Sequence, residues 1–477
     1  MSIRKSVKLN FIIVIICLIL FLTSCQNIST PKLEIFNKEP IVFKIMGNDF
    51  QWGVSSAGYQ CEGGDQYTQW HFWELAGKTE DINGKSVDFY NRYPEDIKLA
   101  KDIGINAFRL SIEWARIFPN KDQVDYNELN YYHKLINTIK SNGMIPLVTL
   151  MHFTHPQWLM NNNDSDGLTG WEDPDTIDEY LKYVQLVVSE FKNDVKFWLT
   201  FNEPNVWVVT GYLAGATPPG KRNPIAFFRV VRNILQAHSR AYDLIHSIEP
   251  QAMVSSNVYQ LSFKFFKNNK ISQFTEQEAQ NFCDTNWFFE SLNTGVLPVE
   301  EKVLFPTNTR FSSGVSLFKK LDYIAFDYYY PITSLKDIPN FFKPWLEPIY
   351  PEGIYKTIMD YHKKYNKPII IAENGLCTEN EKPRPDKWTR GAHIVNHIYH
   401  MQRAIKDGAN VLGYYHWSIT DNYEWGSFTP RFGLYRVDVL KDPTLKRIPT
   451  DGVWAYKDVI SNGGVTLELL KKYPSPN

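Results

Sequence analysis

The chain alternates short apolar runs, each of a length typical of a strand, with longer stretches whose apolar residues have helical spacing. This alternation predicts successive strand–helix units and a parallel sheet. The predicted strands are Phe50–Ala57, Asn106–Ile112, Met144–Met151, Val195–Thr200, Met253–Val258, Tyr323–Asp327, Pro368–Ala372 and Val411–His416. The predicted helices include Pro94–Ile103, Tyr126–Ser141, Thr176–Lys192, Ile225–Ser247, Gly353–Tyr365 and Trp388–Asp407. Eight such units favour an α/β fold made of a single (β/α)8 TIM barrel.

An open, doubly wound sheet is the alternative arrangement of alternating strands and helices. Its first strand would be followed by a glycine-rich loop that binds phosphate. The segment after the first predicted strand contains Gly63-Gly64 behind Glu62, which does not have that pattern. The closed barrel is therefore the predicted fold.

Polar and aromatic residues cluster at the carboxyl ends of seven of the eight predicted strands. They are Gln60, Glu62, Arg109, Glu113, His152, Asn202, Glu203, Asp327, Tyr328, Tyr329, Glu373, Asn374, Trp417, Glu424 and Trp425. In a barrel these strand ends form one rim, and barrel active sites are built there. We therefore expect a functional site at this rim, and we interpret Glu62 and Glu113 as structural because charged rim residues usually pair with neighbours.

The first 25 residues have the features of a targeting segment. Arg4, Lys5 and Lys8 precede the apolar run Phe11–Leu22, which is shorter than the roughly 20 residues that a membrane-spanning helix needs. The run ends in Leu22-Thr23-Ser24-Cys25, which resembles the lipobox of bacterial lipoproteins. The resemblance implies cleavage before the cysteine and lipidation of its thiol, whereas an uncleaved anchor and an ordinary secretory signal remain alternatives.

These features divide the chain into three parts. Residues 1–24 are predicted to be a lipoprotein signal peptide, residues 25–48 a lipidated tether, and residues 49–477 the barrel domain. The predicted location is the cell envelope, with Cys25 anchoring the protein to a bacterial membrane on its periplasmic or extracellular face.

Composition adds two constraints. The formal net charge is −1, which argues against a nucleic-acid partner. Outside the targeting segment the chain has Cys61, Cys283 and Cys377, whose spacing matches no zinc motif. An odd number of cysteines in an exported protein argues against a full disulfide framework, so we expect buried free thiols.

Two rim carboxylates suit the hydrolysis of glycosides. Glu203 follows the fourth predicted strand and Glu373 follows the seventh, so inward-pointing side chains would face each other across the barrel. In glycoside hydrolysis one carboxylic acid protonates the leaving group and a second carboxylate stabilises the cationic transition state. In retaining enzymes the second carboxylate forms a covalent intermediate with the sugar, and the two carboxyl groups are roughly 5–5.5 Å apart.

Four motifs extend this interpretation to a family. Thr200–Pro204 contains Asn-Glu-Pro and Ile371–Gly375 contains Glu-Asn-Gly. Phe108–Pro119 begins within the second predicted strand and continues past its end, and Asp421–Trp425 follows the eighth. From about Phe50 to about Lys472 the chain resembles glycoside hydrolase family 1, the β-glucosidase and β-galactosidase group. The resemblance implies a retaining, exo-acting β-D-glucosidase-like enzyme that hydrolyses O-linked β-glycosides through a covalent glycosyl-enzyme intermediate. It implies no metal ion and no organic cofactor.

The resemblance also implies roles for individual residues. The expected catalytic residues are Glu203 as the acid/base, Glu373 as the nucleophile, and Arg109 and Tyr329 as groups that hold the nucleophile. The expected substrate-binding residues are Gln60, His152, Asn202, Trp417, Glu424 and Trp425, with Asn202 at the sugar 2-hydroxyl and Trp417 under the ring. Arg109 as a core ion-pair partner, His152 as a core histidine and Trp417 as a packing residue remain structural alternatives.

Two departures from the family pattern bear on the chemistry. Asp327 occupies a place where the family usually has Asn, and an extra carboxyl there would raise neighbouring pKa values. The turn after Trp425 is one residue shorter than usual, and we expect Phe428 to supply its aromatic group near the sugar 6-position.

A 6-phospho-β-glycosidase and a noncatalytic, receptor-like sugar-binding member of the same fold are the alternative functions. The presence of both Glu203 and Glu373 argues against the second, and Glu424 argues against the first. The sequence leaves open the preferred sugar, the aglycone, the balance of hydrolysis and transglycosylation, and the oligomeric state.

Overall fold

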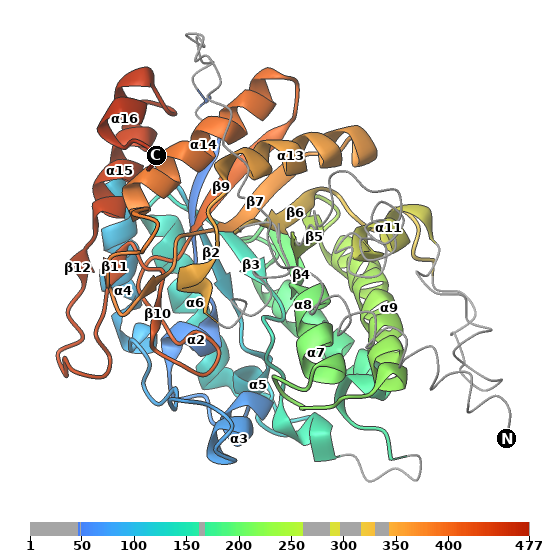
Figure 1. Ribbon diagram of the computed structural model, residues 1–477. Helices are drawn as coiled ribbons and strands as arrows, with labels where there is room; N and C mark the ends of the chain where they lie inside the picture. The colour runs from blue at the N-terminus through green and yellow to red at the C-terminus, as the bar shows by residue number, and fades with distance from the viewer. Residues whose placement is uncertain are drawn as a thin grey trace, which may run out of the picture.

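The computed structural model describes residues 46–47, 49–161, 167–260, 287–295, 316–329 and 343–476. Within these ranges eight parallel strands form a closed barrel in the order β1-β2-β3-β4-β5-β6-β7-β9 (Figure 1). The barrel strands are β1 (Gln51–Ser55), β2 (Ala107–Ser111), β3 (Ile145–Thr149), β4 (Phe197–Asn202), β5 (Met253–Tyr259), β6 (Ile324–Asp327), β7 (Ile369–Asn374) and β9 (Val411–Trp417). This confirms the predicted (β/α)8 barrel and the position of all eight strands.

Helices surround the barrel. They are α2 (Gly58–Glu62), α3 (Gln69–Leu75), α4 (Phe89–Ile103), α5 (Trp114–Ile117), α6 (Tyr126–Ser141), α7 (Thr176–Phe191), α8 (Pro204–Val208), α9 (Pro224–Ile248), α11 (Trp287–Thr294), α13 (Pro351–Tyr365), α14 (Arg390–Lys406), α15 (Asp451–Ser461) and α16 (Leu467–Lys472). Short elements complete the described chain: η1 (Gln157–Asn161), η2 (Gly170–Glu172), η3 (Val209–Leu213), η5 (Pro344–Leu346), β8 (Thr378–Glu379), β10 (Pro430–Arg431), β11 (Tyr435–Arg436) and β12 (Ile448–Pro449).

One predicted helix start was wrong. We expected a helix from Pro94, but α4 begins at Phe89 and contains Pro94 in its interior. Phe89 is 1% exposed and its ring stacks on Phe108 of β2, with centroids 6.2 Å apart. Burial of this ring against the barrel outweighs the tendency of proline to lie in the first helical turn.

The interior of the barrel is filled by side chains. Its core comprises Ala107, Leu147, Phe197, Leu199, Tyr323, Ala325, Ile370, Ala372 and Tyr415. Gly53 of β1 lies against the ring of Tyr415, because a Cβ at position 53 would lie only 2.3 Å from the ring atom Cδ1. This packing closes the middle of the barrel and leaves space for a ligand only at its ends.

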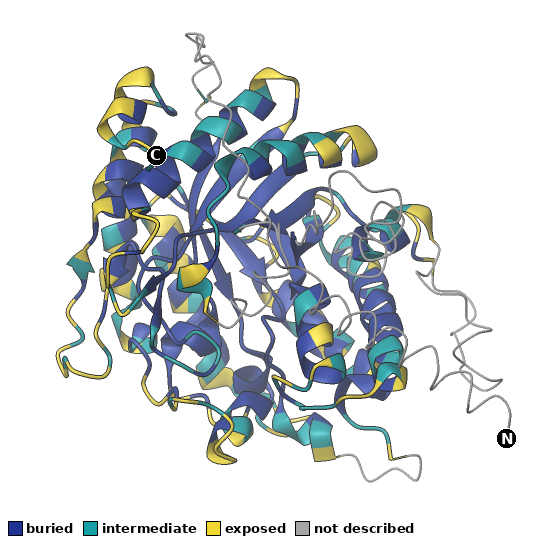
Figure 2. Ribbon diagram, viewed as in Figure 1, coloured by how far each residue is buried: buried dark blue, intermediate teal, exposed yellow. Residues whose placement is uncertain are grey.

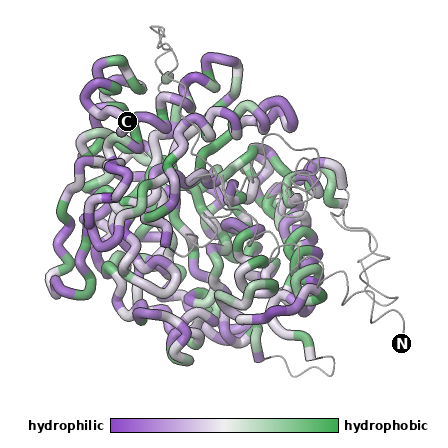
Figure 3. Tube along the Cα trace, in the orientation of Figure 1, coloured by the Kyte–Doolittle hydropathy of each residue, from purple (hydrophilic) through white to green (hydrophobic). Residues whose placement is uncertain are grey.

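A second apolar layer lies between the strands and the helices. The barrel strands are buried along most of their length, with Ile145 at the start of β3 exposed, whereas the helices alternate buried inner and exposed outer faces (Figure 2). Hydrophobic segments accordingly gather at the centre and hydrophilic segments at the periphery (Figure 3). Some polar atoms reinforce this layer: the Tyr180 hydroxyl on α7 donates to the carbonyl of Thr200 on β4 over 2.8 Å. Such contacts fix the strand ends that carry the site.

The predicted signal peptide, and all but a few residues of the predicted tether, lie outside the described residues. Among the helices that the structure describes, none combines the length and the apolar character required to cross a membrane. Cys61 and Cys377 are buried free thiols, as expected, and Cys283 lies outside the described residues.

Candidate active site

A cavity of about 410 Å³ opens at the carboxyl ends of the barrel strands. Nine of the ten predicted catalytic and substrate-binding residues line it: Gln60, His152, Asn202, Glu203, Tyr329, Glu373, Trp417, Glu424 and Trp425. The tenth, Arg109, is completely buried on β2 and bonds directly to one of the lining carboxylates. The structure therefore brings all ten residues together at the predicted rim.

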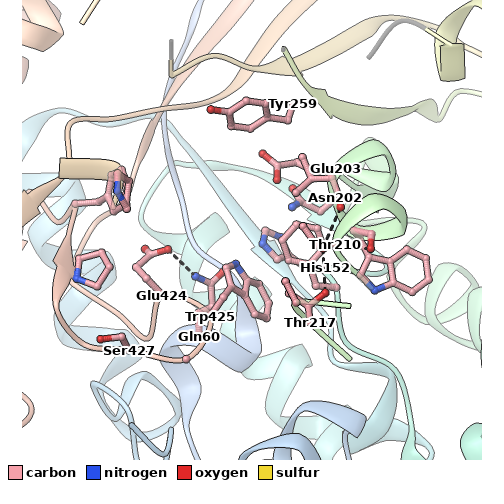
Figure 4. Close-up of a pocket in the computed structure, with 18 of the residues that line it drawn as sticks. Gln60, His152, Asn202, Glu203, Thr210, Thr217, Tyr259, Glu424, Trp425 and Ser427 are labelled. Carbon is pink, nitrogen blue, oxygen red and sulfur yellow. Dashed lines mark hydrogen bonds between the residues drawn. The ribbon is translucent and has the colours of Figure 1, made fainter. Parts of the chain in front are cut away.

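Glu203 lies where β4 passes into α8. Its backbone has φ +39° and ψ +53°, a left-handed conformation that is uncommon outside glycine. Pro204 begins α8 immediately afterwards, and the Glu203 amide donates to the Asn257 carbonyl over 2.8 Å. Strained backbone of this kind is often found at functional sites, where the surrounding structure holds it in place. Here it turns the carboxyl into the cavity (Figure 4).

Burial raises the pKa of Glu203 well above its usual range, and the charges of Asp327 and Glu373 raise it further. The opposing effect of Arg109 is smaller. Both main effects disfavour the ionised form. These surroundings favour the protonated form of Glu203, the form that can donate a proton.

Glu373, at the end of β7, has donors on both carboxylate oxygens. Arg109 Nη1 donates to Oε1 over 2.5 Å, and the Tyr329 hydroxyl donates to Oε2 over 2.8 Å. Burial raises the pKa of Glu373, whereas the Arg109 charge and both hydrogen bonds oppose that rise. Of the two carboxyls that face each other, Glu373 therefore has the surroundings that favour the ionised form more.

The guanidinium of Arg109 connects several strands beneath the cavity. Besides Glu373, it donates to Asn202 Oδ1 over 2.6 Å and to Thr149 Oγ1 over 3.0 Å. Burial, together with the Arg109 charge, lowers the pKa of His152 well below its usual range, so its imidazole is neutral. Arg109 therefore forms a buried ion pair, as expected if its role were structural. Its partner, however, is Glu373, the carboxylate that faces the cavity.

The opposite wall of the cavity is built around Glu424. Trp417 Nε1 donates to Glu424 Oε1 over 3.0 Å. Gln60 Nε2 donates to Glu424 Oε2 over 3.3 Å (Figure 4). Burial raises the pKa of Glu424 to about 8, against the opposing effect of the Trp417 hydrogen bond. The His152 ring lies parallel to those of Trp417 and Trp425, with centroids 5.9 and 5.8 Å away. Polar atoms and aromatic faces thus alternate on this wall, as in sites that bind the hydroxyls and apolar faces of sugars.

Comparison with known proteins agrees with this arrangement. The family model described as glycosyl hydrolase family 1 matches residues 43–344 and 337–465. The chain belongs to this family. It is therefore a glycoside hydrolase of the β-glucosidase and β-galactosidase group.

Individual relatives cover nearly the whole chain. A β-glucosidase A from Acetivibrio thermocellus is 30% identical and a β-galactosidase from Pyrococcus woesei is 29% identical, and the matches cover 87% and 88% of this chain and 98% of each relative. Among solved structures, a family 1 β-glucosidase from Thermotoga maritima has a TM-score of 0.79 at 27% identity, covering 89% of this chain and all of that one. A β-glycosidase from Pyrococcus horikoshii has a TM-score of 0.77 at 29% identity, covering 91% and 99%.

The interpretation of Glu62 and Glu113 as structural residues is consistent with their contacts. Glu62 pairs with Arg116, with Nε and Oε2 2.9 Å apart. Glu113 accepts hydrogen bonds from Ser111 over 2.7 Å and from Thr154 over 2.5 Å. The partners of both carboxylates belong to the rim, and neither carboxylate lines the cavity.

The expectation for Phe428 was wrong. Its side chain is 1% exposed and packs against Tyr423, with ring centroids 5.2 Å apart, so it belongs to the core instead of the cavity. Ser427 and Thr429 line the cavity on either side of it. In this shortened turn the aromatic side chain points inward and the two hydroxyl residues point to the cavity.

Sequence reasoning missed Asn257 and Tyr259 on β5, the strand without a predicted rim residue. Asn257 Nδ2 donates to Asn202 Oδ1 over 2.6 Å, and the Tyr259 ring stacks on Tyr329 at 5.7 Å. The sequence did contain one indication, because Asn257 and Tyr259 are two residues apart at the end of an apolar run and would point to the same side of a strand. It is weak, because asparagine and tyrosine are common at strand ends.

Proposed function

We propose that the protein is a retaining, exo-acting β-glycosidase, similar to β-D-glucosidases, which hydrolyses O-linked β-glycosides through a covalent glycosyl-enzyme intermediate. The observation that carries this proposal is the spacing of two carboxyls with different electrostatic surroundings. Carboxylate oxygens of Glu203 and Glu373 lie within 4.8 Å of each other. Retaining enzymes have roughly 5–5.5 Å between these groups, whereas inverting enzymes need roughly 6.5–9.5 Å to admit a water molecule.

In the first step, the ionised Glu373 attacks the anomeric carbon and forms an ester with the sugar. The bond from that carbon to the glycosidic oxygen breaks, and the proton of Glu203 moves to the departing oxygen. Arg109 and Tyr329 donate hydrogen bonds that favour the ionised form of Glu373 before the attack. After the attack they can still donate to the ester group that Glu373 has formed.

In the second step, the ionised Glu203 removes a proton from a water molecule. The water oxygen attacks the same carbon, and Glu373 leaves as a carboxylate. Asn202, held by Arg109 and Asn257, is positioned for the sugar 2-hydroxyl, a contact that strengthens in the transition state. Both faces of the anomeric carbon are attacked once, so the product keeps the β configuration.

The wall around Glu424 supports a terminal, unphosphorylated sugar as the substrate group. Gln60, His152 and Trp417 are almost completely buried there, which favours one sugar ring over a continuing chain. Both β-glucosidases and β-galactosidases are among the relatives. A 6-phosphorylated sugar is disfavoured because no lysine or arginine lies between Trp425 and Arg431 to neutralise the phosphate.

A panel of aryl β-glycosides tests the proposal. We expect kcat/KM to be highest for β-glucosides or β-galactosides and negligible for the 6-phosphorylated forms. Proton NMR of the first product should show the β-anomer before mutarotation. An α-anomer as first product would contradict the retaining mechanism, and binding of sugars without turnover would favour the noncatalytic alternative.

We also propose that Cys25 carries lipid and anchors the enzyme in the cell envelope. The support is the sequence alone: a basic start, the apolar run Phe11–Leu22 and the lipobox-like Leu22–Cys25. An anchored glycosidase would act on glycosides outside the cytoplasm.

A further inference from the structure

Asp327, at the end of β6, is a completely buried carboxyl next to the proposed acid. Its Oδ2 accepts a hydrogen bond from Asn257 Nδ2 over 2.5 Å. Its Oδ1 is buried and receives no hydrogen from an amide, hydroxyl or guanidinium group among the residues that the structure describes. A buried carboxylate oxygen without a donor is costly, so a donor is expected.

The proposed acid is the group in position to supply that donor. Carboxylate oxygens of Asp327, Glu203 and Glu373 all lie within 4.8 Å of one another. Three ionised carboxylates this close together in a buried site would repel one another strongly. A proton on one of the adjoining carboxyls, Asp327 or Glu203, removes that repulsion and lets the protonated group donate to the other.

The charges around the pair indicate which carboxyl holds the proton. The titratable groups facing it are Arg109 on β2, Glu373 on β7 and Tyr329 after β6. The single hydroxyl hydrogen of Tyr329 goes to Glu373, and Arg109 donates to Glu373, Asn202 and Thr149 instead of Asp327. Both amide hydrogens of Asn257 are used as well, since Nδ2 donates to Asp327 and to Asn202. Asp327 already accepts one amide hydrogen and is the better site for negative charge, whereas the Glu203 carboxyl accepts none from the residues that the structure describes and is the better site for the proton.

We propose that Asp327 is a positioning residue for Glu203: its carboxylate accepts the hydrogen of the protonated Glu203 and keeps the proton there until the leaving group takes it. This inference rests on the proposed function, which assigns Glu203 as the acid. Once the proton has moved to the leaving oxygen, Glu373 has lost its charge in the ester. The negative charge of Asp327 then makes the neighbouring Glu203 a stronger base toward water.

The charge on Asp327 matters here, not only its shape. Asparagine, usual at this place in the resembling family, has the same shape, but it is neutral and its single oxygen can take the place of only one of the two carboxylate oxygens that accept hydrogen bonds. A neutral amide does not oppose ionisation of Glu203. The consequence of the aspartate is therefore activity that persists to higher pH than with asparagine at the same position.

The test is the pH profile of kcat/KM, measured on an aryl glycoside with a poor leaving group. In Asp327→Asn the pKa of Glu203 should fall, because a neighbouring negative charge is lost, and the alkaline limb should move to lower pH with it. We expect a shift of about one pH unit, the size of an ordinary interaction with a neighbouring charge. Asp327→Ser, smaller and also neutral, should shift the limb in the same direction. Asp360→Asn, an exposed change of the same type on α13, should leave it in place.

Outcomes separate this inference from the proposed function. Glu203→Gln, assayed on an activated leaving group that needs no proton, should lose the alkaline limb altogether. A limb that persists in Glu203→Gln would overturn the assignment of Glu203. A limb that disappears in Glu203→Gln but stays unchanged in both folded Asp327 variants would overturn the role of Asp327 alone.

Discussion

Arg109 and Glu373 lie 264 residues apart in the chain, yet Nη1 of one and Oε1 of the other are 2.5 Å apart at the floor of the cavity. Both side chains are almost completely buried, at 0% and 5% exposure. A charge-assisted bond at this burial is strong, and loss of one partner leaves the other charge uncompensated. The pair therefore determines both the ionisation of the proposed nucleophile and the stability of the barrel floor.

The first prediction concerns Glu373 itself. Glu373→Gln should reduce hydrolysis of activated aryl glycosides to background, because an amide cannot form the glycosyl ester. The variant should also have a lower Tm, because Arg109 loses its anionic partner. Steady-state assays and thermal unfolding test the two parts. Substantial turnover by a folded variant would contradict the nucleophile assignment.

The second prediction concerns the acid. Glu203→Ala should lower kcat/KM strongly for poor leaving groups and much less for good ones, since only poor ones need the proton. Azide should restore turnover and yield a β-glycosyl azide, because the shortened side chain leaves room for the anion. Glu203→Gln is the matched control: its side chain fills that space, so azide should not rescue it. Equal losses on all leaving groups would argue against the acid role.

The third prediction concerns pH dependence. The Tyr329 hydroxyl favours the ionised form of Glu373 and so lowers its pKa against the effect of burial. Tyr329→Phe removes that contribution, the pKa of Glu373 rises, and the acidic limb of kcat/KM moves to higher pH. In Tyr328→Phe the lost hydroxyl bonds to the Tyr350 carbonyl, away from the cavity, so the limb should stay in place. Coinciding acidic limbs of the two variants would contradict this role.

The fourth prediction concerns the sugar's outer hydroxyls. A hydrogen bond to a charged group contributes roughly 1.5–3 kcal/mol, or about tenfold to a hundredfold in kcat/KM. Glu424→Ala should therefore cost about that factor on an aryl β-glucoside and much less on the matching xyloside, which lacks the 6-hydroxyl. Because burial raises the pKa of Glu424 to about 8, both substrates should be assayed at one pH above that value, where the carboxylate is charged. Equal losses would show that Glu424 does not contact the 6-position.

The fifth prediction concerns the membrane anchor. Cys25→Ala should prevent lipidation, so labelled fatty acid should enter the wild-type protein and not the variant. More than one acyl chain is needed for firm membrane attachment, and lipoprotein modification provides it. Label in both proteins, or in neither, would contradict the proposal.

The barrel could be predicted from the chain's own pattern, because eight apolar runs separated by amphipathic stretches have few ways to bury their surfaces. The same pattern also indicated which residues lie at the rim, since in a parallel barrel all strand ends of one polarity meet there. Glu203 and Glu373 were identified this way, with the family motifs as support.

The interactions among these side chains could not be predicted and followed from the folded chain. Asn257 donates hydrogen bonds to both Asn202 and Asp327. No pattern around Asn257 in the sequence indicated either contact. The direction of Phe428 likewise depends on a turn whose backbone path no local pattern specifies. Hydrogen bonds and pKa values depend on distances of a few ångströms between distant segments and on burial, which close packing of the whole barrel sets. The sequence could therefore identify the two carboxyls, whereas their hydrogen-bond partners and the direction of their pKa shifts depend on the fold.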